Sequence, residues 1–511
     1  MLGKKYYQPK LFTEFNLADR VPDYNFYRRL KSVLNLDFLH AKTKAYYGSC
    51  GQKSIDPAVF FKIMLVGYLE NIISDRQLMQ HCSMRLDILY FLEYDIDEEL
   101  PWHSTISRTR QRLPQALFEE VFDRVLSLCV NAGMVSGSTQ AVDSAYVKAN
   151  ASLDSLEQKL PTDTAKNHLK KVLEQDQNQE QDSSENAGDY EQENDEDYKY
   201  ISVNERKLKD IAAREKLWAA RHKRKPGTHD PRSKFLSNKL HYSPTDPEAR
   251  VAVKPGKRRQ LCYAAQVAVD TSHHVISHIQ ADFSDRKDCQ ILPSLLQNLI
   301  HRFKKHDLKV DRLLADTGYS NGENYALLEK HGIEGYIPAH GTYKQEKEGF
   351  TYDEKEDVWI CSQGKKATFR RFYMERGNLV KRYYTKRKDC KDCPIKIACI
   401  GKQHEKKISK TAYQAEYERM IARVESSKGQ YLKKRRQATV EPVLGTLINF
   451  MGMRKVNTRG LALAHKNFVL AAASYNLKKY LNFTKKRVLA QVNALEGQIS
   501  AIFNIPSFCL S

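Results

Sequence analysis

Apolar and polar residues alternate with two different periods, and the change of period divides the chain. Up to about residue 135, apolar residues recur every three or four positions, which predicts amphipathic helices. The clearest are 75–94 and 118–132, whereas 56–71 is apolar around most of its circumference and is expected to be buried. From about residue 140 the period shortens to two, which predicts β-strands. The pattern therefore predicts a helical region followed by a mixed core.

One core segment shows both kinds of pattern together. A short apolar strand begins at residue 310 and ends at Asp316, and a tight turn follows. Ser320 and Glu323 fit a capping box that opens the next helix, which Gly332 ends. The other predicted core elements are strands at 140–149, 261–270, 274–281 and 334–337, helices at 288–306, 462–481 and 485–498, and a helix with an apolar stripe from Val440 to Met451.

Two insertions interrupt the core pattern. Residues 174–197 contain eleven acidic residues and almost nothing apolar, which is typical of a solvated insertion, and basic tracts follow it. One hypothesis is that this acidic tract occupies a nucleic-acid surface transiently. The second insertion carries cysteines. The expected domains are a helical DNA-binding or accessory domain at 1–135, the first part of the core at 136–338 with its insertion at about 150–260, the cysteine insertion at 339–430, the rest of the core at 431–484, and a C-terminal helix or tail at 485–511.

The net charge of the chain indicates which class of molecule it binds. The chain has 83 Lys and Arg against 62 Asp and Glu, a formal charge of +21, which favours a polyanion, nucleic acid before membrane. A basic protein that is merely soluble is the alternative. After the turn at 101–105, a predicted helix carries Arg108, Arg110 and Arg112, an arrangement compatible with helix-turn-helix DNA binding. The alternative is a solvated helix face.

The sequence predicts a cytoplasmic protein. The first ten residues have no apolar segment of the kind that a signal peptide needs. The longest apolar run, 57–69, is interrupted by Lys62 and is too short to span a bilayer. Ten cysteines, mostly scattered, do not form a disulfide framework. We therefore expect reduced thiols and no membrane partner.

Four cysteines of the second insertion form a candidate metal site. Cys390 and Cys393 make a CxxC pair, and Cys361 and Cys399 bring the number of thiolates to four, as a closed tetrahedral zinc site requires. Inert thiols and a redox pair are the other interpretations of the same spacing. The sequence thus predicts structural zinc without excluding either.

Three carboxylates stand at unusual positions. Asp143 lies in the middle of a predicted strand, where aspartate is disfavoured because its side chain competes for the backbone and resists burial. Asp316 ends a strand, at the edge where α/β sheets place their chemistry, although a strand-end helix cap is an equally ordinary role. Glu441 borders the apolar stripe of its helix, between clusters of basic residues. A solvent-facing glutamate is the alternative interpretation.

Such a set of carboxylates makes physical sense as a metal site. Without cations, three clustered carboxylates repel one another, and one would be protonated at neutral pH. Hard cations such as Mg²⁺ prefer oxygen ligands. Two such ions about 4 Å apart activate a nucleophile on one side of a phosphodiester and stabilise the leaving oxygen on the other. The pattern therefore points to phosphodiester chemistry.

The order of elements resembles the ribonuclease-H-like core of bacterial insertion-sequence DDE transposases. The motifs AVDSAYVKANAS, LLADTGYSNGENY and RRQATVEPVLGTLINFMGMRKVNTRG resemble the family's two aspartate regions and its glutamate helix. The stretch PWHSTISRTRQRL resembles its upstream accessory domain. The implied fold is a mixed five-stranded sheet with flanking helices, an α+β or α/β arrangement. In many relatives a Tyr, an Arg and a Lys flank the glutamate, where this chain has Lys434, Gln437 and Ile448.

The resemblance implies a function. Asp143, Asp316 and Glu441 would be the catalytic triad, holding two Mg²⁺ or Mn²⁺ ions. The reaction would be cleavage at the ends of a mobile element, followed by strand transfer into target DNA, by a homodimer or larger assembly on double-stranded DNA in the bacterial nucleoid. A structure-specific nuclease or resolvase, and a catalytically silent DNA-binding regulator, are the alternatives. The residues expected to contact DNA are Arg108, Arg110, Arg112, Lys148, Arg435, Arg436, Arg454 and Lys455.

Overall fold

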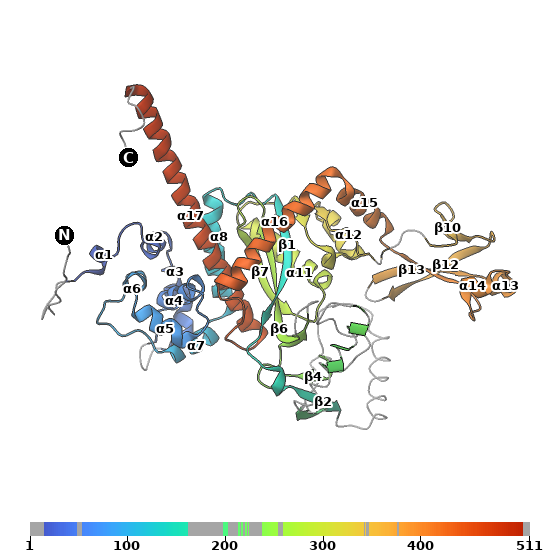
Figure 1. Cartoon of the computed structure of the whole chain (residues 1–511), viewed down its shortest axis with the longest axis horizontal. Helices are drawn as coiled ribbons and strands as arrows, with labels where there is room; N and C mark the ends of the chain where they lie inside the picture. The colour runs from blue at the N-terminus through green and yellow to red at the C-terminus, as the bar shows by residue number, and fades with distance from the viewer. Residues whose placement is uncertain are drawn as a thin grey trace.

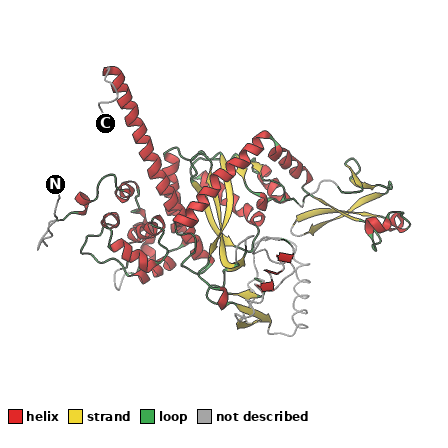
Figure 2. Cartoon of the chain, in the orientation of Figure 1, coloured by secondary structure: helices red, strands yellow, loops and turns green. Residues whose placement is uncertain are grey.

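The computed structural model describes most of the predicted core. The described residues are 15–48, 54–161, 198–202, 238–253, 259–341, 343, 347–375 and 378–503, with a few more between 213 and 223. The predicted acidic tract at 174–197 and most of the basic tracts at 206–224 and 254–259 lie outside them. Within the described part, the chain combines a helical N-terminal region with mixed β-sheets, as predicted (Figures 1 and 2).

The N-terminal region is built from short helices around one buried helix. Asp56 caps that helix and accepts hydrogen bonds from the backbone of Ala58 and Val59, and Pro57 follows at its first position. The predicted single helix at 75–94 is wrong, because the chain ends one helix at Ser83 and starts another after Arg85. The helices are α1 (Leu17–Arg20), α2 (Phe26–Val33), α3 (Phe38–Thr43), α4 (Pro57–Leu69), α5 (Asp75–Ser83), α6 (Leu86–Leu92), α7 (His103–Arg112) and α8 (Gln115–Asn131).

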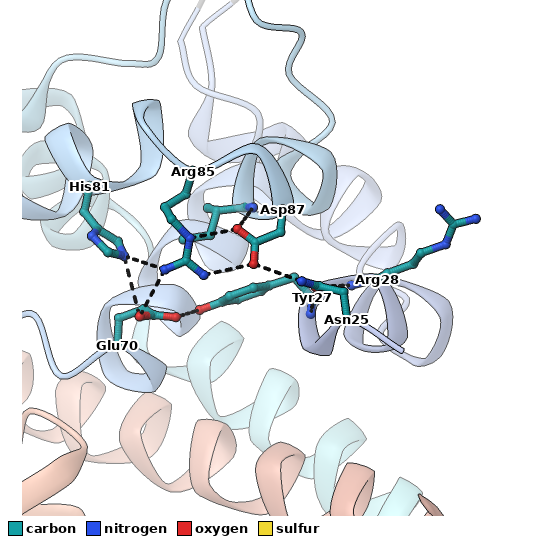
Figure 3. A network of polar contacts seen from close by, with 8 residues as sticks. Asn25, Tyr27, Arg28, Glu70, His81, Arg85 and Asp87 are labelled. Carbon is teal, nitrogen blue, oxygen red and sulfur yellow. Dashed lines mark hydrogen bonds and ion pairs between the residues drawn. The ribbon is translucent and has the colours of Figure 1, made fainter. Parts of the chain in front are cut away.

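A polar network joins the ends of α2, α4 and α6. The Tyr27 hydroxyl donates to Glu70 at 2.6 Å, and Arg85 donates to both oxygens of Asp87 at 2.9 Å (Figure 3). Asn25 adds a third bond to Asp87. Burial alone would raise the pKa of Asp87, but these hydrogen bonds and the Arg85 charge hold it below its ordinary value.

The central sheet lies beside this region and has strands in the order β7, β6, β1, β8, β9. The β7, β6 and β1 strands pair antiparallel, whereas β1, β8 and β9 pair parallel. Five strands are predicted, but a sixth, β5, also pairs with β6. The strands are β1 (Thr139–Lys148), β5 (Arg250–Ala252), β6 (Gln260–Asp270), β7 (Ile276–Phe283), β8 (Arg312–Leu314) and β9 (Glu334–Tyr336).

Helices cover the sheet, and the last of them ties it to the N-terminal region. In α17, Asn476 bonds both the N–H and the C=O of Ile276 in β7, and Lys466 donates to the carbonyls of Arg110 and Leu113. One continuous helix replaces the two predicted at 462–481 and 485–498 (Figure 1). The core helices are α11 (Asp288–Lys304), α12 (Gly322–Lys330), α15 (Gln414–Glu425), α16 (Ser427–Phe450) and α17 (Leu461–Phe503).

The start of α12 differs from the predicted capping box. Asn321, rather than Ser320, is the N-cap and accepts a hydrogen bond from the backbone of Glu323. The Ser320 hydroxyl instead pairs with the hydroxyl of Tyr325 at 2.8 Å. Adjacent Ser and Asn are both good caps, so the sequence signal did not distinguish between them.

Two further sheets flank the core. A small one has strand order β3, β2, β4, and a five-stranded antiparallel one follows β9 in the chain. We call the second sheet and its two short helices the arm; it extends away from the core beyond α12 and α15 (Figure 1). The elements are β2 (Glu157–Pro161), β3 (Tyr198–Ser202) and β4 (His241–Tyr242), then β10 (Phe350–Asp353), β11 (Val358–Cys361), β12 (Lys366–Glu375), β13 (Asn378–Thr385), α13 (Arg387–Lys391), α14 (Lys396–Ile400) and β14 (Lys407–Thr411).

Candidate active site

The register of two parallel strands brings two of the predicted carboxylates side by side. Ala141 of β1 pairs with Leu314, the last residue of β8, so Asp143 lies two residues further along β1 and Asp316 lies two residues beyond the end of β8. Asp143 and Asp316 are therefore level with each other at the carboxyl end of β8. Their charges interact, since Asp143 is one cause of the raised pKa of Asp316. The sequence prediction that these residues meet is consistent with this geometry.

Asp143 is held by two donors. The backbone N–H of Ser144 donates to Oδ1 at 2.8 Å, and Arg436 donates from Nη1 to Oδ2 at 3.0 Å. The Asp316 carboxylate accepts the N–H of Gly318 at 2.9 Å. Burial raises the pKa of Asp316 first, the Asp143 charge raises it further, and the Gly318 bond and the Arg436 charge offset only part of that rise.

A third carboxylate, which the sequence analysis missed, lies beside Asp316. Asp288 is the first residue of α11, and Gln266 of β6 donates to its Oδ1 at 2.8 Å. A Cβ placed on Gly318 would lie 3.0 Å from Oδ1 of Asp316 and 3.1 Å from Oδ2 of Asp288, so both carboxylates border the same small space. In the sequence, Asp288 is an ordinary acidic residue in the first turn of a helix, which gives no signal of this position.

A buried tyrosine completes the polar cluster. The Tyr319 hydroxyl donates to Oε1 of Gln266 at 2.5 Å, which leaves the Gln266 amide free to donate to Asp288. Tyr319 is fully buried, and its pKa is raised by burial and then by the charges of Asp288, Asp143 and Asp316. The hydroxyl therefore stays a neutral donor that fixes the orientation of Gln266.

The position of Glu441 differs from that of the two aspartates. It lies on α16, five residues beyond Arg436, and its side chain is exposed, whereas the neighbouring Val440 is buried. At about 100° per residue, Glu441 points about 140° away from Arg436 around the helix. Within the described residues, no three His, Cys, Asp or Glu side chains are placed to hold one metal ion. The predicted triad therefore remains a prediction, with Arg436 and not Glu441 in contact with Asp143.

The predicted DNA-contacting residues fall into three groups. Arg110 is 1% exposed and ion-paired to Asp75 at 2.7 Å, so we leave it out of any DNA surface. Arg436 donates a hydrogen bond to Asp143, and Arg435 donates to the carbonyl of Thr271 at 2.8 Å. The others are at least partly exposed: Arg108 and Arg112 on α7, and Lys148, Arg454 and Lys455, whose backbones pair at the last residue of β1.

The four cysteines of the arm share one cavity. Cys361, Cys390, Cys393 and Cys399 all border a space of about 670 Å³, and all four thiols are free. Cys361 accepts the N–H of Lys365 at 3.3 Å, and Cys390 pairs with the Thr385 hydroxyl at 3.1 Å. The four cysteines border one cavity, as the zinc hypothesis expects. Among the described residues, however, no three of these side chains are close enough together to hold one metal ion.

Two protein families match this chain. The family described as Transposase domain (DUF772) matches residues 15–112, which form the helices α1 to α7. The family described as Transposase DDE domain matches residues 360–481, which include most of the arm, α16 and Glu441. The chain is an insertion-sequence DDE transposase. No curated protein sequence matches it.

The family assignment fixes the partner and the kind of chemistry. Transposases act on DNA, and DDE transposases in general use divalent metal ions such as Mg²⁺. Asp143 and Asp316 both lie between the two matched segments, so their roles are not carried by the match. Throughout the described residues, no helix is both long and apolar enough to cross a membrane.

Proposed function

We propose that this transposase cleaves DNA at the ends of its element and transfers the freed strand to a target. In this proposal its central sheet is a ribonuclease-H-like core, and Asp143, Asp316 and Glu441 hold two Mg²⁺ or Mn²⁺ ions. The observation that carries the proposal is the level pair of aspartates, in which burial and then the Asp143 charge raise the pKa of Asp316. Such a pair is costly in a protein unless a cation binds between the carboxylates.

The residues around the aspartates fit a hard cation. The carboxylate oxygens of Asp143 and Asp316 keep lone pairs that their hydrogen bonds do not use. Carboxylate oxygens are the ligands that Mg²⁺ prefers. Asp288 adds a further carboxylate beside Asp316, held by Gln266. When bound, the cations would supply the Lewis acidity that activates a water or a 3′ hydroxyl and stabilises the leaving oxygen.

The chain's own groups would position the DNA. Arg436 holds the Asp143 carboxylate in one orientation, since it donates a hydrogen bond directly to that carboxylate. Lys148, the last residue of β1, and Arg454, to whose carbonyl its backbone N–H donates, would contact DNA phosphates further along the duplex. Glu441 is exposed on α16, next to Pro442, which interrupts the helix hydrogen bonds at this point. Bound DNA and cations would draw its carboxylate in as the third ligand.

The proposal includes a partner arrangement. Paired terminal repeats and target DNA would be bound by a homodimer or a larger assembly, because strand transfer requires two ends and a target together.

Strand transfer is also the reaction whose measurement distinguishes this function from its alternatives. The purified chain should join a 3′ hydroxyl end of a labelled element fragment to a second plasmid in Mg²⁺. Cleavage without joining would identify a nuclease or resolvase, and binding without cleavage would identify a silent regulator.

A structural zinc ion is a separate part of the proposal. Four thiols around one cavity suit zinc in a reducing compartment. Purified protein should contain about one zinc per chain, and Cys393→Ser should lose it. The matched control is Cys289→Ser, because Cys289 is a free thiol outside the arm. Absence of metal from the unmodified protein would favour inert thiols, and a disulfide between Cys390 and Cys393 would favour a redox pair.

A further inference from the structure

The arm carries a disproportionate share of the charge of the chain. The arm, residues 350–411, contains seventeen Lys and Arg and eight Asp and Glu, which gives it nine of the 21 net positive charges. The aspartate cluster and the N-terminal helices lie outside the arm, so they do not explain why positive charge is concentrated there. A positive field of this strength on a projecting element favours a polyanion at that element.

In the outer half of the arm β12 is an edge strand, because it pairs there only with β13, whose other side pairs with β14. In β12, residues 366–368 pair with β11, whereas residues 369–375 pair with β13 alone in the described structure. We call residues 369–375 of β12 and their partners 378–383 of β13 the ribbon. Side chains on both of its faces reach solvent, since six consecutive β12 residues, Phe369–Met374, are exposed.

One face of the ribbon is cationic. Arg371 and Arg382 are directly opposite each other across the two strands. Like charges at opposed positions destabilise a sheet, and Glu375, 3.7 Å from Arg382, compensates only one of them. The Arg382 guanidinium also stacks on the Tyr373 ring at 3.7 Å, which holds it in place. An anion between the two guanidinium groups would remove the repulsion.

The other face is apolar and equally exposed. Phe369, Phe372 and Met374 are 39%, 53% and 55% exposed, and the two phenylalanine rings contact each other at 5.2 Å. The Lys381 ammonium lies 5.8 Å from the Phe369 ring. Large apolar side chains gathered on a surface mark a contact with a partner. The partner must therefore offer both anionic and apolar groups.

We infer that the ribbon is a contact for duplex DNA, separate from the aspartate cluster. The DNA backbone offers phosphates to Arg371 and Arg382 on the cationic face. Thymine methyl groups and sugars offer apolar surface to Phe372 and Met374. A second copy of the arm fits poorly because it would bring together two arms that each carry a net charge of +9. The inference rests on DNA as the family partner and not on the metal chemistry.

Binding without metal tests the ribbon alone. Full-length protein is titrated onto a labelled duplex in EDTA over a range of salt concentrations. Arg371→Ala/Arg382→Ala should weaken binding about tenfold and reduce the slope of log K against log salt by about 2, since each arginine would neutralise about one phosphate. The matched control, Lys304→Ala/Lys330→Ala, removes two exposed charges from α11 and α12 and should change neither quantity. Equal behaviour of the two double variants would overturn the inference.

Folding and partner identity have separate readouts. Arg371→Ala alone relieves the repulsion and should not lower the unfolding temperature, so weaker DNA binding by this variant cannot be ascribed to misfolding. Replacement of Phe372 by a photoreactive benzoylphenylalanine should yield protein–DNA adducts after irradiation. Adducts between two protein chains, or no DNA adduct, would overturn the inference. Cleavage by the unmodified protein in Mg²⁺, measured on the same duplex, shows independently whether the proposed function holds.

Discussion

Arg436 of α16 donates a hydrogen bond from Nη1 to Oδ2 of Asp143 in β1 at 3.0 Å, across 293 positions of sequence. Both side chains are mostly buried, 11% and 19% exposed. The pair fixes which face of α16 meets the sheet. The pair also places a mostly buried positive charge beside two aspartates. The Arg436 charge therefore offsets part of the repulsion between the two carboxylates.

Loss of Arg436 should destabilise the protein. In Arg436→Met, the repulsion between Asp143 and Asp316 is uncompensated, and we expect the free energy of unfolding to fall by about 2 kcal/mol at neutral pH without metal. Urea denaturation measures it. The matched control is Lys434→Met, an exposed residue on the same helix, which should change stability by less than about 0.5 kcal/mol. Equal effects would show that the arginine is not balancing the aspartates.

Removal of the Asp316 charge should have the opposite effect. Burial and Asp143 raise the pKa of Asp316, so its favourable contribution is complete at low pH and is lost as pH rises through that raised pKa. At neutral pH, Asp316→Asn should therefore raise the unfolding temperature in EDTA. It should also abolish the further rise that Mg²⁺ gives the unmodified protein. Asp311→Asn, at an exposed position just before β8, should leave both values unchanged.

Glu441 should matter for activity and not for stability. Because its side chain is exposed, Glu441→Gln should change the free energy of unfolding by less than about 0.5 kcal/mol. DNA cleavage should fall by about 100-fold or more if the carboxylate binds a cation in the complex with DNA. Unchanged cleavage would remove Glu441 from the site and leave Asp288 as the third carboxylate.

Asp288 should tune the affinity for metal. Asp288→Asn keeps its bond with Gln266 only if the amide turns its oxygen toward the donor, but removes a charge beside Asp316. The Mg²⁺ concentration for half-maximal cleavage should rise about tenfold, as for other residues that support a metal ligand. Asp285→Asn is the control on the neighbouring loop, where the carboxylate is 3.7 Å from Arg250. A shift shared by both variants would indicate only a general loss of negative charge.

A buried histidine predicts the acid sensitivity of the core. Burial and the Arg302 charge lower the pKa of His278 to about 3, from 6.5 in an unfolded chain. A histidine buried in its neutral form contributes stability that is complete above about pH 6.5 and is lost as pH falls toward 3. The loss should approach about 1.4 kcal/mol per pH unit, measured by urea denaturation between about pH 7 and 4. His278→Gln should flatten this dependence over the same range.

The repeating patterns predicted the fold well, because they reflect burial. The helical N-terminal region, the hairpin of β6 and β7, and the short strand ending before Asp316 follow directly from apolar periodicity. Boundaries were less predictable, since Ser320 and Asn321 are both able to cap α12, and nothing in the sequence marks the sixth strand, β5. The predicted domain boundaries stay a prediction.

The site was predictable only in part. Asp143 and Asp316 stand out because each occupies a strand position that ordinary aspartates avoid. Asp288 does not, since its importance comes from the fold that brings the start of α11 to the end of β8. Arg436 was predicted to contact DNA, and only the packing of α16 on β1 shows that it pairs with Asp143. Tertiary contacts of this kind leave no local trace in a sequence.

The central claim is that the two level aspartates bind the cations that cleave DNA. Its most direct measurement is nicking of a plasmid that carries the reading frame with its flanking DNA, with and without Mg²⁺. The unmodified protein should nick at the element ends only with Mg²⁺, and Asp143→Asn and Asp316→Asn should lose about 100-fold or more of that activity while remaining folded. Full Mg²⁺-dependent nicking by either folded variant would contradict the claim.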